Sequence, residues 1–211
     1  MLQFLLDWLV RADSPARADA IFALAGHKSR KVFAIQLFEQ GMAPRLLFSV
    51  GRFEIRRFPE LGLPPTIDLL QVAQNIPPPQ RHFFVLFEGQ QFAVQRIPVR
   101  VLGTLSEIDA LADWVREHPA ISSLLIVSSA AHLRRLRICC RMLLPQKIRT
   151  NFLAAPEESA MPNQQNWWNE ASTSKAVLSE FVKIVCYSVF LPFWKSARPW
   201  RKKAISSAAL R

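Results

Sequence analysis

The chain has 211 residues, half of them hydrophobic and a fifth charged, and this ordinary globular composition excludes the disordered, collagen-like and low-complexity classes. A chain of this length is expected to form one domain that buries a sizeable core without help from a metal or a disulfide. Its 27 basic and 16 acidic residues give a net charge of +11, which favours an anionic partner: nucleic acid, an acidic membrane surface or a phosphorylated ligand.

The chain begins with an apolar run, MLQFLLDWLV, which predicts an amphipathic helix that packs on the domain. Asp7 interrupts the run, no basic residue precedes it and no clear cleavage site follows it, so we do not expect a signal peptide. Residues 1–18 form the predicted N-terminal extension.

Short apolar runs alternate with amphipathic stretches through the middle of the chain. Strands are expected at 20–25, 45–50, 123–128 and 150–154, with two more within 82–101 about Glu88-Gly89, and helices are expected at 29–40, 61–74, 106–117, 130–144 and 172–190. This alternation predicts an α/β domain over residues 19–190: a three-layer, Rossmann-like, mostly parallel sheet with helices on both faces.

The C-terminal part of the chain is apolar and then basic. Residues 176–194 are apolar apart from two charged residues, and residues 195–211 add six basic residues and no acidic one. Aromatic and basic residues side by side are typical of a segment that lies on an anionic membrane surface, here residues 181–211. The alternative is a last helix packed on the core, followed by a solvated basic tail over 191–211.

Two prolines bear on the length of this last helix. Proline lacks the N–H that a helix interior uses, so Pro192 and Pro199 predict that the helix ends near Phe190. No run of 18 uncharged apolar residues occurs in the chain, so we expect no membrane span.

Ligands of doubly wound parallel sheets bind beyond the carboxyl ends of the strands, so the loops that follow the predicted strands form the candidate site. In the first loop Gly26 permits a tight turn, and Lys28 is one of four potential cations at the start of the next helix. Cations there oppose the helix dipole, and a bound anion would resolve that conflict. The alternative is that these side chains are solvated. Neither a dinucleotide fingerprint nor a P-loop motif is present.

The loop before the helix at 130–144 repeats this pattern. Ser129 is a candidate N-cap, His132 falls in the first turn, and Arg134 and Arg135 follow it. A helix N-terminus lowers the pKa of a histidine, so His132 would act as a base or donate a hydrogen bond to a ligand oxygen. The alternatives are a capping or packing histidine and a solvated basic helix face.

Two further loops carry weaker signals. Thr104 and Glu107 have the spacing of a capping box, in which each side chain satisfies a free backbone N–H and no ligand is needed. In a second interpretation Glu107 faces His132 across neighbouring loops and orients it. Ser49 and Gly51 place small residues at the end of another strand.

In their order along the chain, these loops resemble motifs of the YdcF/SanA/ElyC-like family, a bacterial family long catalogued as a domain of unknown function. The D-x-I-x-x-L-G-G strand of the family is matched by DAIFALAG at 19–26, its Ser-Gly-Gly strand end by SVG at 49–51, its Asn-Thr-x-x-Glu segment by GTLSE at 103–107, and its strongest motif, V-T-S-x-x-H-x-x-R, by VSSAAHLRR at 127–135. A late tryptophan and a final Glu-x-x-Lys helix are matched by WW at 167–168 and EFVK at 180–183.

The resemblance spans roughly residues 19–187 and implies a Rossmann-like domain with a site for an anionic, nucleotide-like ligand. It also implies a role in bacterial cell-envelope biogenesis, with S-adenosylmethionine or another nucleotide as cofactor. Ala25 and Val50 replace glycines of the family and narrow the loops, so it stays open whether a reaction is catalysed. The candidate catalytic residues are His132 and Glu107, and the candidate ligand-binding residues are Gly26, Lys28, Ser49, Gly51, Thr104, Ser128, Ser129, Arg134 and Arg135.

These observations leave three functions. The first is binding of a phosphorylated or nucleotide-like anion in bacterial cell-envelope or polysaccharide biogenesis. The second is a non-catalytic peripheral membrane or scaffold protein with a degenerate pocket. The third, nucleic-acid binding through the basic tail, is disfavoured because the sequence has no helix-turn-helix, zinc-finger or RNP pattern.

Cysteine and histidine usage completes the prediction. Three cysteines, two of them adjacent at Cys139 and Cys140, match neither a disulfide framework nor a C-x-x-C site. They indicate a reduced setting, so we expect a cytoplasmic protein that is either free or peripheral on the inner face of the plasma membrane. The four histidines are scattered without ligand spacing, so no metal site is expected.

Overall fold

A computed structural model describes residues 2–51, 54, 82–89, 91–96, 103–156 and 167–208 of the chain. At its centre is a six-stranded sheet in the order β4-β3-β2-β1-β5-β6. Neighbouring strands among β2, β1, β5 and β6 pair in parallel, and β3 and β4 are antiparallel. The strands are β1 (Ala20–Ala23), β2 (Arg45–Val50), β3 (Phe83–Glu88), β4 (Gln91–Arg96), β5 (Ser123–Ser128) and β6 (Arg149–Ala154).

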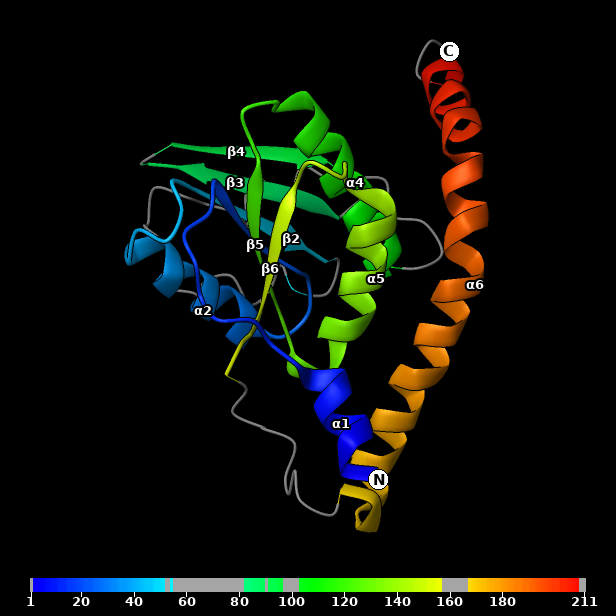
Figure 1. Ribbon diagram of the computed structural model, residues 1–211. Coiled ribbons are helices and arrows are strands. Elements are labelled where there is room, and N and C mark those ends of the chain that lie inside the picture. The colour runs from blue at the N-terminus through cyan, green and yellow to red at the C-terminus, as the bar shows by residue number, and fades with distance from the viewer. Residues whose placement is uncertain are drawn as a thin grey trace.

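Helices cover both faces of this sheet, and Figure 1 shows α2 on one face with α4, α5 and α6 on the other. The predicted three-layer, Rossmann-like α/β fold is therefore confirmed. The helices are α1 (Leu2–Val10), α2 (Lys28–Glu39), α4 (Gly103–Glu117), α5 (Leu133–Leu143) and α6 (Ala171–Ala208), with short 3₁₀ turns η3 (Ala130–His132) and η4 (Trp167–Asn169).

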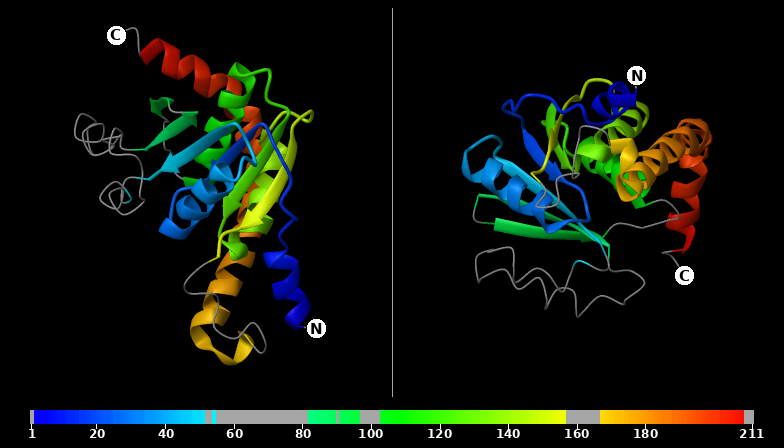
Figure 2. Two further views of the ribbon diagram at one scale, coloured as in Figure 1. Left: turned by 90° about the vertical axis from the view of Figure 1, so that its left-hand side faces the viewer. Right: turned by 90° about the horizontal axis from the view of Figure 1, so that it is seen from below.

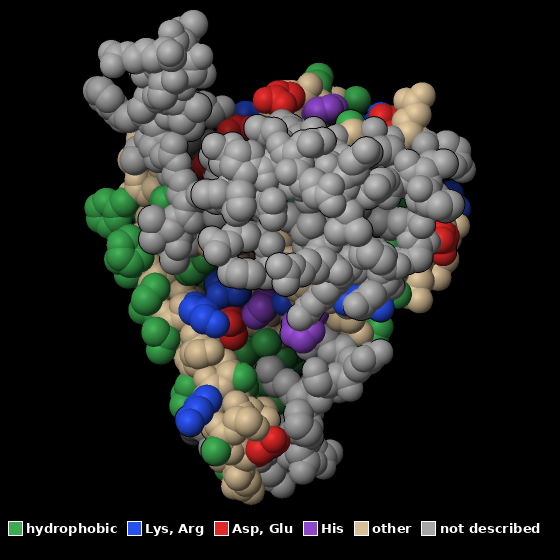
Figure 3. All heavy atoms as spheres, turned by 180° about the vertical axis from the view of Figure 1, so that it is seen from behind, with side chains coloured by type: hydrophobic (Ala, Val, Ile, Leu, Met, Phe, Trp, Pro, Cys, Tyr) green, Lys and Arg blue, Asp and Glu red, His purple; other side chains and the backbone are tan. Residues whose placement is uncertain are grey.

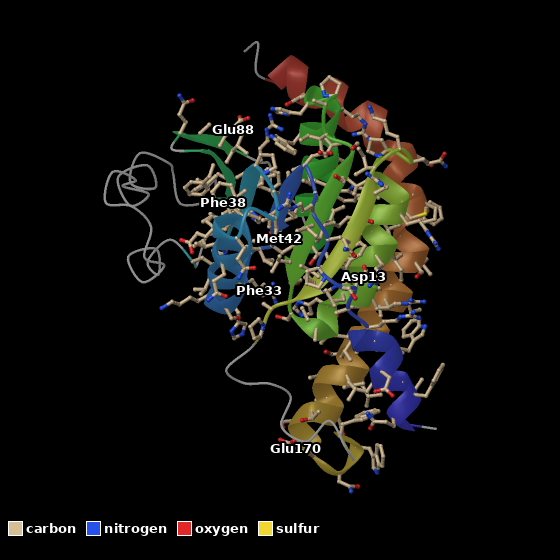
Figure 4. The ribbon with its side chains drawn as sticks, turned by 60° about the vertical axis from the view of Figure 1, so that its left-hand side comes forward. Asp13, Phe33, Phe38, Met42, Glu88 and Glu170 are labelled. Atoms are coloured by element: carbon tan, nitrogen blue, oxygen red, sulfur yellow. The ribbon has the colours of Figure 1, made fainter. Side chains whose placement is uncertain are left out.

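Successive side chains of each strand point to opposite faces of the sheet, so the core has two layers, one on each face. Phe22 of β1 faces the α4 and α5 side, where it meets Phe84 edge to face at 5.4 Å. Phe48 of β2 faces the α2 side, where it meets Phe87 at 5.3 Å. Figure 4 shows Phe33, Phe38 and Met42 on that same side, on α2 and the turn that follows it. Because both faces are covered, all four residues of β1 are buried.

The region of the two predicted strands within 82–101 forms an antiparallel hairpin of β3 and β4. Gly89, between them, has a φ of +60°, a conformation that glycine adopts without strain. The two strands predicted here are therefore confirmed, and the structure shows that they pair as a hairpin. The helix predicted at 61–74 lies outside the described residues.

The last helix is longer than the sequence predicts. Helix α6 continues through Pro192 and Pro199 to Ala208, so the predicted end near Phe190 is wrong. Tertiary packing spans the first proline: Tyr187 and Leu191 are buried in the core that α4 and α5 share, and Trp194, after Pro192, packs against the same core. The predicted domain boundary after residue 190 consequently lies inside α6.

Helix α1 packs against α6, as the apolar pattern of the N-terminal run predicts. Leu6 and Leu9 are buried beside Val177 and Ile184, and Trp8 stacks on Phe181 with 5.8 Å between ring centroids. Figure 2 shows α1 alongside the first turns of α6.

Helix α6 also carries an exposed apolar face. The segment Ala171–Trp194 has a mean hydropathy of 1.6 and is long enough to cross a membrane by length and composition alone, although 28% of its most apolar window is buried in the domain. The core helix of a soluble protein also meets this criterion. We call five residues the apolar stripe of α6, each at least 56% exposed: Leu178, Val182, Val185, Val189 and Phe193.

The sheet has its topological switch point beside β1. Strand β1 lies between β2 and β5, and the chain leaves β1 through α2 to one side and β5 through α5 to the other. Two adjacent parallel strands whose connections lead in opposite directions diverge at their carboxyl ends, which is where such sheets bind ligands. The carboxyl ends of β1 and β5 are therefore the place to examine for function.

Candidate functional site

Glu107 of α4 ties the carboxyl ends of β1 and β2 together. Its Oε1 accepts hydrogen bonds from Ser49 Oγ at 2.5 Å and from the backbone N–H of Ala25 at 3.0 Å. Since Ser49 donates to Glu107, its oxygen accepts from His82 Nε2, 3.0 Å away. Burial acts to raise the pKa of Glu107, but the contacts with His82, Ser49 and Ala25 outweigh it and the pKa is lowered. Glu107 is therefore an ionised carboxylate whose hydrogen bonds hold two loops together.

A second carboxylate, Glu54, occupies the place where the sequence predicts a ligand anion. Its Oε1 accepts from the Gly26 N–H at 2.7 Å and from Lys31 Nζ at 2.5 Å, and its Oε2 accepts from the Gly51 N–H at 2.6 Å. Gly26 has a φ of +129°, and a Cβ there would lie 2.7 Å from Arg30 Nη1. The two loop glycines therefore bind an anion of the chain itself, and burial lowers the pKa of Lys31 despite the contact with Glu54.

Arg30 joins the first loop to the loop after β5. Its guanidinium is buried and donates through Nε and Nη2 to Ser129 Oγ, at 3.0 and 2.7 Å. The same Nη2 lies 3.0 Å from His132 Nδ1, and Nη1 donates to the carbonyl of Ala25. Ser129 is at the N-cap position of η3, as predicted, but its hydroxyl accepts from Arg30 and caps no backbone N–H.

Glu180 of α6 lies on the other side of His132 and completes a cluster of charges. Its Oε1 is 2.7 Å from Lys183 Nζ and 3.5 Å from His132 Nε2, and its Oε2 is 3.4 Å from Arg135 Nη1. Glu180 and Arg135 are buried, whereas the Lys183 side chain is 46% exposed. We call Arg30, His132, Arg135, Glu180 and Lys183 the switch-point cluster.

The switch-point cluster fixes the protonation of His132. Burial and the nearby charges of Arg30, Arg135 and Lys183 lower the pKa of His132 from 6.5 to about 3. Arginine only donates hydrogen bonds, so Nδ1 accepts from Arg30 and the proton of the neutral ring is on Nε2. The predicted direction of the pKa shift is confirmed, but its cause is burial and cations. With Nδ1 occupied, the ring is arranged to donate a hydrogen bond and not to act as a base.

This protonation has a consequence for stability. The folded chain keeps His132 neutral down to a pH of about 3, whereas the unfolded chain protonates it near pH 6.5. The unfolded state therefore binds more protons in this window. The contribution of His132 to stability is present above pH 6.5 and is lost progressively as the pH falls towards 3.

Several predicted roles differ from the structure. Glu107 does not orient His132: its partners are Ser49 and Ala25, and His82 takes the place predicted for His132. The capping box is wrong as well, because α4 already begins at Gly103 and Glu107 reaches out to neighbouring loops.

Of the predicted ligand-binding residues, Arg135 belongs to the switch-point cluster, whereas Thr104, Lys28 and Arg134 make other contacts or are exposed. Thr104 contacts the phenol of Tyr187. Lys28 is exposed at the first position of α2. Arg134 points towards α1, where its guanidinium stacks at 4.0 Å on the ring of Trp8. It therefore lies on a different face of α5 from Arg135.

The structure also brings in charged residues that we did not assign to the site. Arg30 and Lys31 belong to the loop where the sequence predicts a cluster of cations, and Glu180 and Lys183 belong to the Glu-x-x-Lys helix. Motifs in the sequence could therefore have indicated these four residues as part of the site. Glu54 and His82 come from the region that least resembles the family, and no motif marks them. Ser128 Oγ is fully buried at the end of β5 and has no hydrogen-bond partner among the described residues.

Comparison of the chain with protein-family models, curated proteins and solved structures finds no match in any of the three. Among the described residues, no group of three or more His, Cys, Asp or Glu side chains is placed to hold a metal ion. Fold and site together define a Rossmann-like α/β domain with buried cations and carboxylates at its switch point. Figure 3 shows histidine, basic and acidic side chains close together on one face of the molecule.

Proposed function

We propose that this chain is a YdcF/SanA/ElyC-like domain that binds a phosphorylated or nucleotide-like anion at the carboxyl ends of β1 and β5, in bacterial cell-envelope or polysaccharide biogenesis. One observation supports the proposal most: Arg30, Arg135 and Lys183 surround a neutral His132 at the switch point of the sheet. Like charges repel one another, and an anion bound among them removes that repulsion. Glu180 pairs with two of these cations, Arg135 and Lys183.

The exposed fractions of these side chains indicate which of them can contact a ligand directly. The side chains of His132 and Lys183 are 30% and 46% exposed, so a ligand oxygen could accept hydrogen bonds from both. Arg30 and Arg135 are buried and would act through their charge. Nucleotides and S-adenosylmethionine both carry oxyanions that suit these donors, and we assign no reaction step.

A thermal-shift screen tests this proposal, with nucleotides, sugar nucleotides, S-adenosylmethionine and polyprenyl phosphate analogues as probes. A ligand present at 100 times its Kd should add about 2.7 kcal/mol to the stability of the wild type. The variant His132→Ala/Lys183→Gln changes two partly exposed groups and should lose this shift, whereas Arg45→Gln, on β2, should keep it. The proposal fails if no anion shifts the melting temperature, or if both variants respond like the wild type.

The apolar stripe of α6 favours a second candidate function, that of a peripheral membrane protein. The stripe lies on the side of α6 opposite to the buried residues Val177, Ile184 and Leu191. The basic residues of 195–211 follow it directly in the sequence. An apolar helix face next to a basic segment suits the inner, anionic face of a plasma membrane. Figure 3 shows a row of hydrophobic side chains along the edge of the molecule that α6 forms.

Flotation with vesicles tests the membrane role. The wild type should float with vesicles of phosphatidylglycerol and remain behind with vesicles of phosphatidylcholine alone, because basic residues add about 1 kcal/mol each on an anionic surface. The variant Val182→Asp/Val189→Asp places charges on the stripe and should reduce flotation at least tenfold. Ser179→Asp, exposed but to one side of the stripe, is its control. If all three proteins float equally, the stripe has no membrane role.

A further inference from the structure

A groove lined by arginines lies away from the switch-point cluster, between α5 and the edge strand β6. Its volume is about 730 Å³, within the range of small-molecule sites. One wall carries Arg134, Arg137 and Arg141, which recur at three- and four-residue spacing and so share one face of α5. We call this hollow the arginine groove. The sequence pattern alone suggested that these residues form a solvated helix face.

The arginine groove is lined by apolar as well as polar side chains. Ile138, Leu144 and Phe152 line it together with Thr150 and Gln146. Phe152 is buried, and the guanidinium of Arg137 lies 4.6 Å above its ring. A hollow that offers cations beside apolar side chains suits an organic anion, which can use both, more than a bare inorganic ion.

Among the described residues, one ion pair with an acidic side chain involves the arginines that line the arginine groove. Asp13 pairs with Arg137 at 2.7 Å, and Figure 4 shows Asp13 beside β6. Burial and the charges of Arg137, Arg141 and Arg11 lower the pKa of Arg134, which indicates that the arginines repel one another. One carboxylate thus faces a cluster of four guanidinium groups in the described structure.

The guanidinium of Arg134 also has a donor without an acceptor among the described residues. Arg134 stacks its face on Trp8, and its buried Nε has no acceptor among the described residues. Stacking uses the face of a guanidinium and leaves its edge N–H groups for an acceptor in the same plane. Phosphate matches this fork of donors in geometry and charge.

From these features we infer that the arginine groove is a second ligand site, which binds an organic phosphate with an apolar or aromatic body. The phosphate would lie against the arginines of α5, and the body would lie against the lining residues Ile138, Leu144 and Phe152. The site is independent of the proposed function, since its residues belong to a different face of α5 from Arg135 and His132.

Calorimetric titration with 1-naphthyl phosphate tests the inference, with inorganic phosphate, 1-naphthol and dihexanoyl phosphatidic acid as comparison probes. Naphthyl phosphate should bind at least tenfold more tightly than inorganic phosphate or naphthol, because neither of these fills both parts of the groove. Tighter binding of the phosphatidic acid would identify a lipid headgroup as the natural source of the phosphate, and weaker binding a soluble organic phosphate.

Variants at Arg141 locate the binding, because this side chain is exposed and its replacement leaves the core intact. Arg141→Gln should weaken binding of naphthyl phosphate about tenfold and Arg141→Glu about a hundredfold, as loss and reversal of a charged hydrogen bond require. Arg45→Gln removes the same charge elsewhere and should have no effect. The inference is overturned if naphthyl phosphate does not bind, if Arg45→Gln weakens binding as much as Arg141→Gln, or if His132→Ala/Lys183→Gln abolishes it.

Discussion

Replacing Glu180 by glutamine should lower the free energy of unfolding by about 3 kcal/mol, because it removes the carboxylate from a buried ion pair and leaves Arg135 charged inside the protein. The same change should strengthen binding of a phosphorylated ligand, since the ligand would no longer compete with Glu180 for His132 and Lys183. Urea unfolding in the absence and presence of ligand measures both effects.

Lys183→Gln is the matched control for this prediction. Lys183 contacts the same carboxylate at 2.7 Å, but its side chain is 46% exposed. Exposed ion pairs contribute less than about 1 kcal/mol, so this variant should be nearly as stable as the wild type. Equal stability of Glu180→Gln and wild type would show that Glu180 does not compensate the buried arginine.

Glu54→Ala should cost about 4 kcal/mol, the second large effect that we expect. The change leaves Lys31 charged and buried and removes the acceptor for the N–H groups of Gly26 and Gly51. A second substitution, Lys31→Met, removes the orphaned charge and should restore part of the loss. The double-mutant cycle from urea unfolding therefore gives a coupling energy of at least 1 kcal/mol between the two side chains.

A surface pair provides the comparison for the Glu54 cycle. Arg45 and Glu88 form an ion pair at 2.7 Å with side chains that are 28% and 55% exposed. Glu88→Ala should therefore cost less than about 1 kcal/mol. The coupling energy between Glu54 and Lys31 should exceed the cost of Glu88→Ala. A coupling energy no larger than that cost would contradict a role for Glu54 as the anion bound by the loops of Gly26 and Gly51.

The sequence was sufficient to predict the layers and the place of the site. Apolar runs end at Ala25-Gly26, Val50-Gly51 and Ser128, and the helix-length connections favour a parallel arrangement for most strands. The carboxyl ends of the strands meet at one edge of the sheet, so the loops that follow had to come together there. The ends of strands and the order of elements depend on local sequence, so the sequence pattern predicts them well.

The partners of each charge were not predictable in the same way. Arg30 and Lys31 are adjacent in the sequence, but one donates to Ser129 and the other to Glu54. Arg134 and Arg135 are also adjacent, and the 100° turn between consecutive helix residues directs one to Trp8 and the other to Glu180. Helical spacing predicts that the side chains of Arg134 and Arg135 point in different directions. The elements packed against α5 determine which residue each side chain contacts.

The length of α6 shows the same limit. The proline rule is local and predicts an end near Phe190, whereas burial of Leu191 by residues far away in the sequence carries the helix onwards. Local preferences therefore failed where tertiary packing was strong.

We propose that burial and the surrounding cations keep His132 neutral until the anion of a ligand joins them. An NMR titration of the histidine side-chain nitrogens from pH 8 to pH 4 measures this directly, without and with a nucleoside diphosphate or S-adenosylmethionine. We predict that free His132 stays neutral, with its proton on Nε2, throughout this range. A bound anion should raise its pKa and shift its resonances, while His118, which stacks on Trp114, is unaffected. A His132 that titrates near pH 6.5 and does not respond to any phosphorylated ligand would contradict the account.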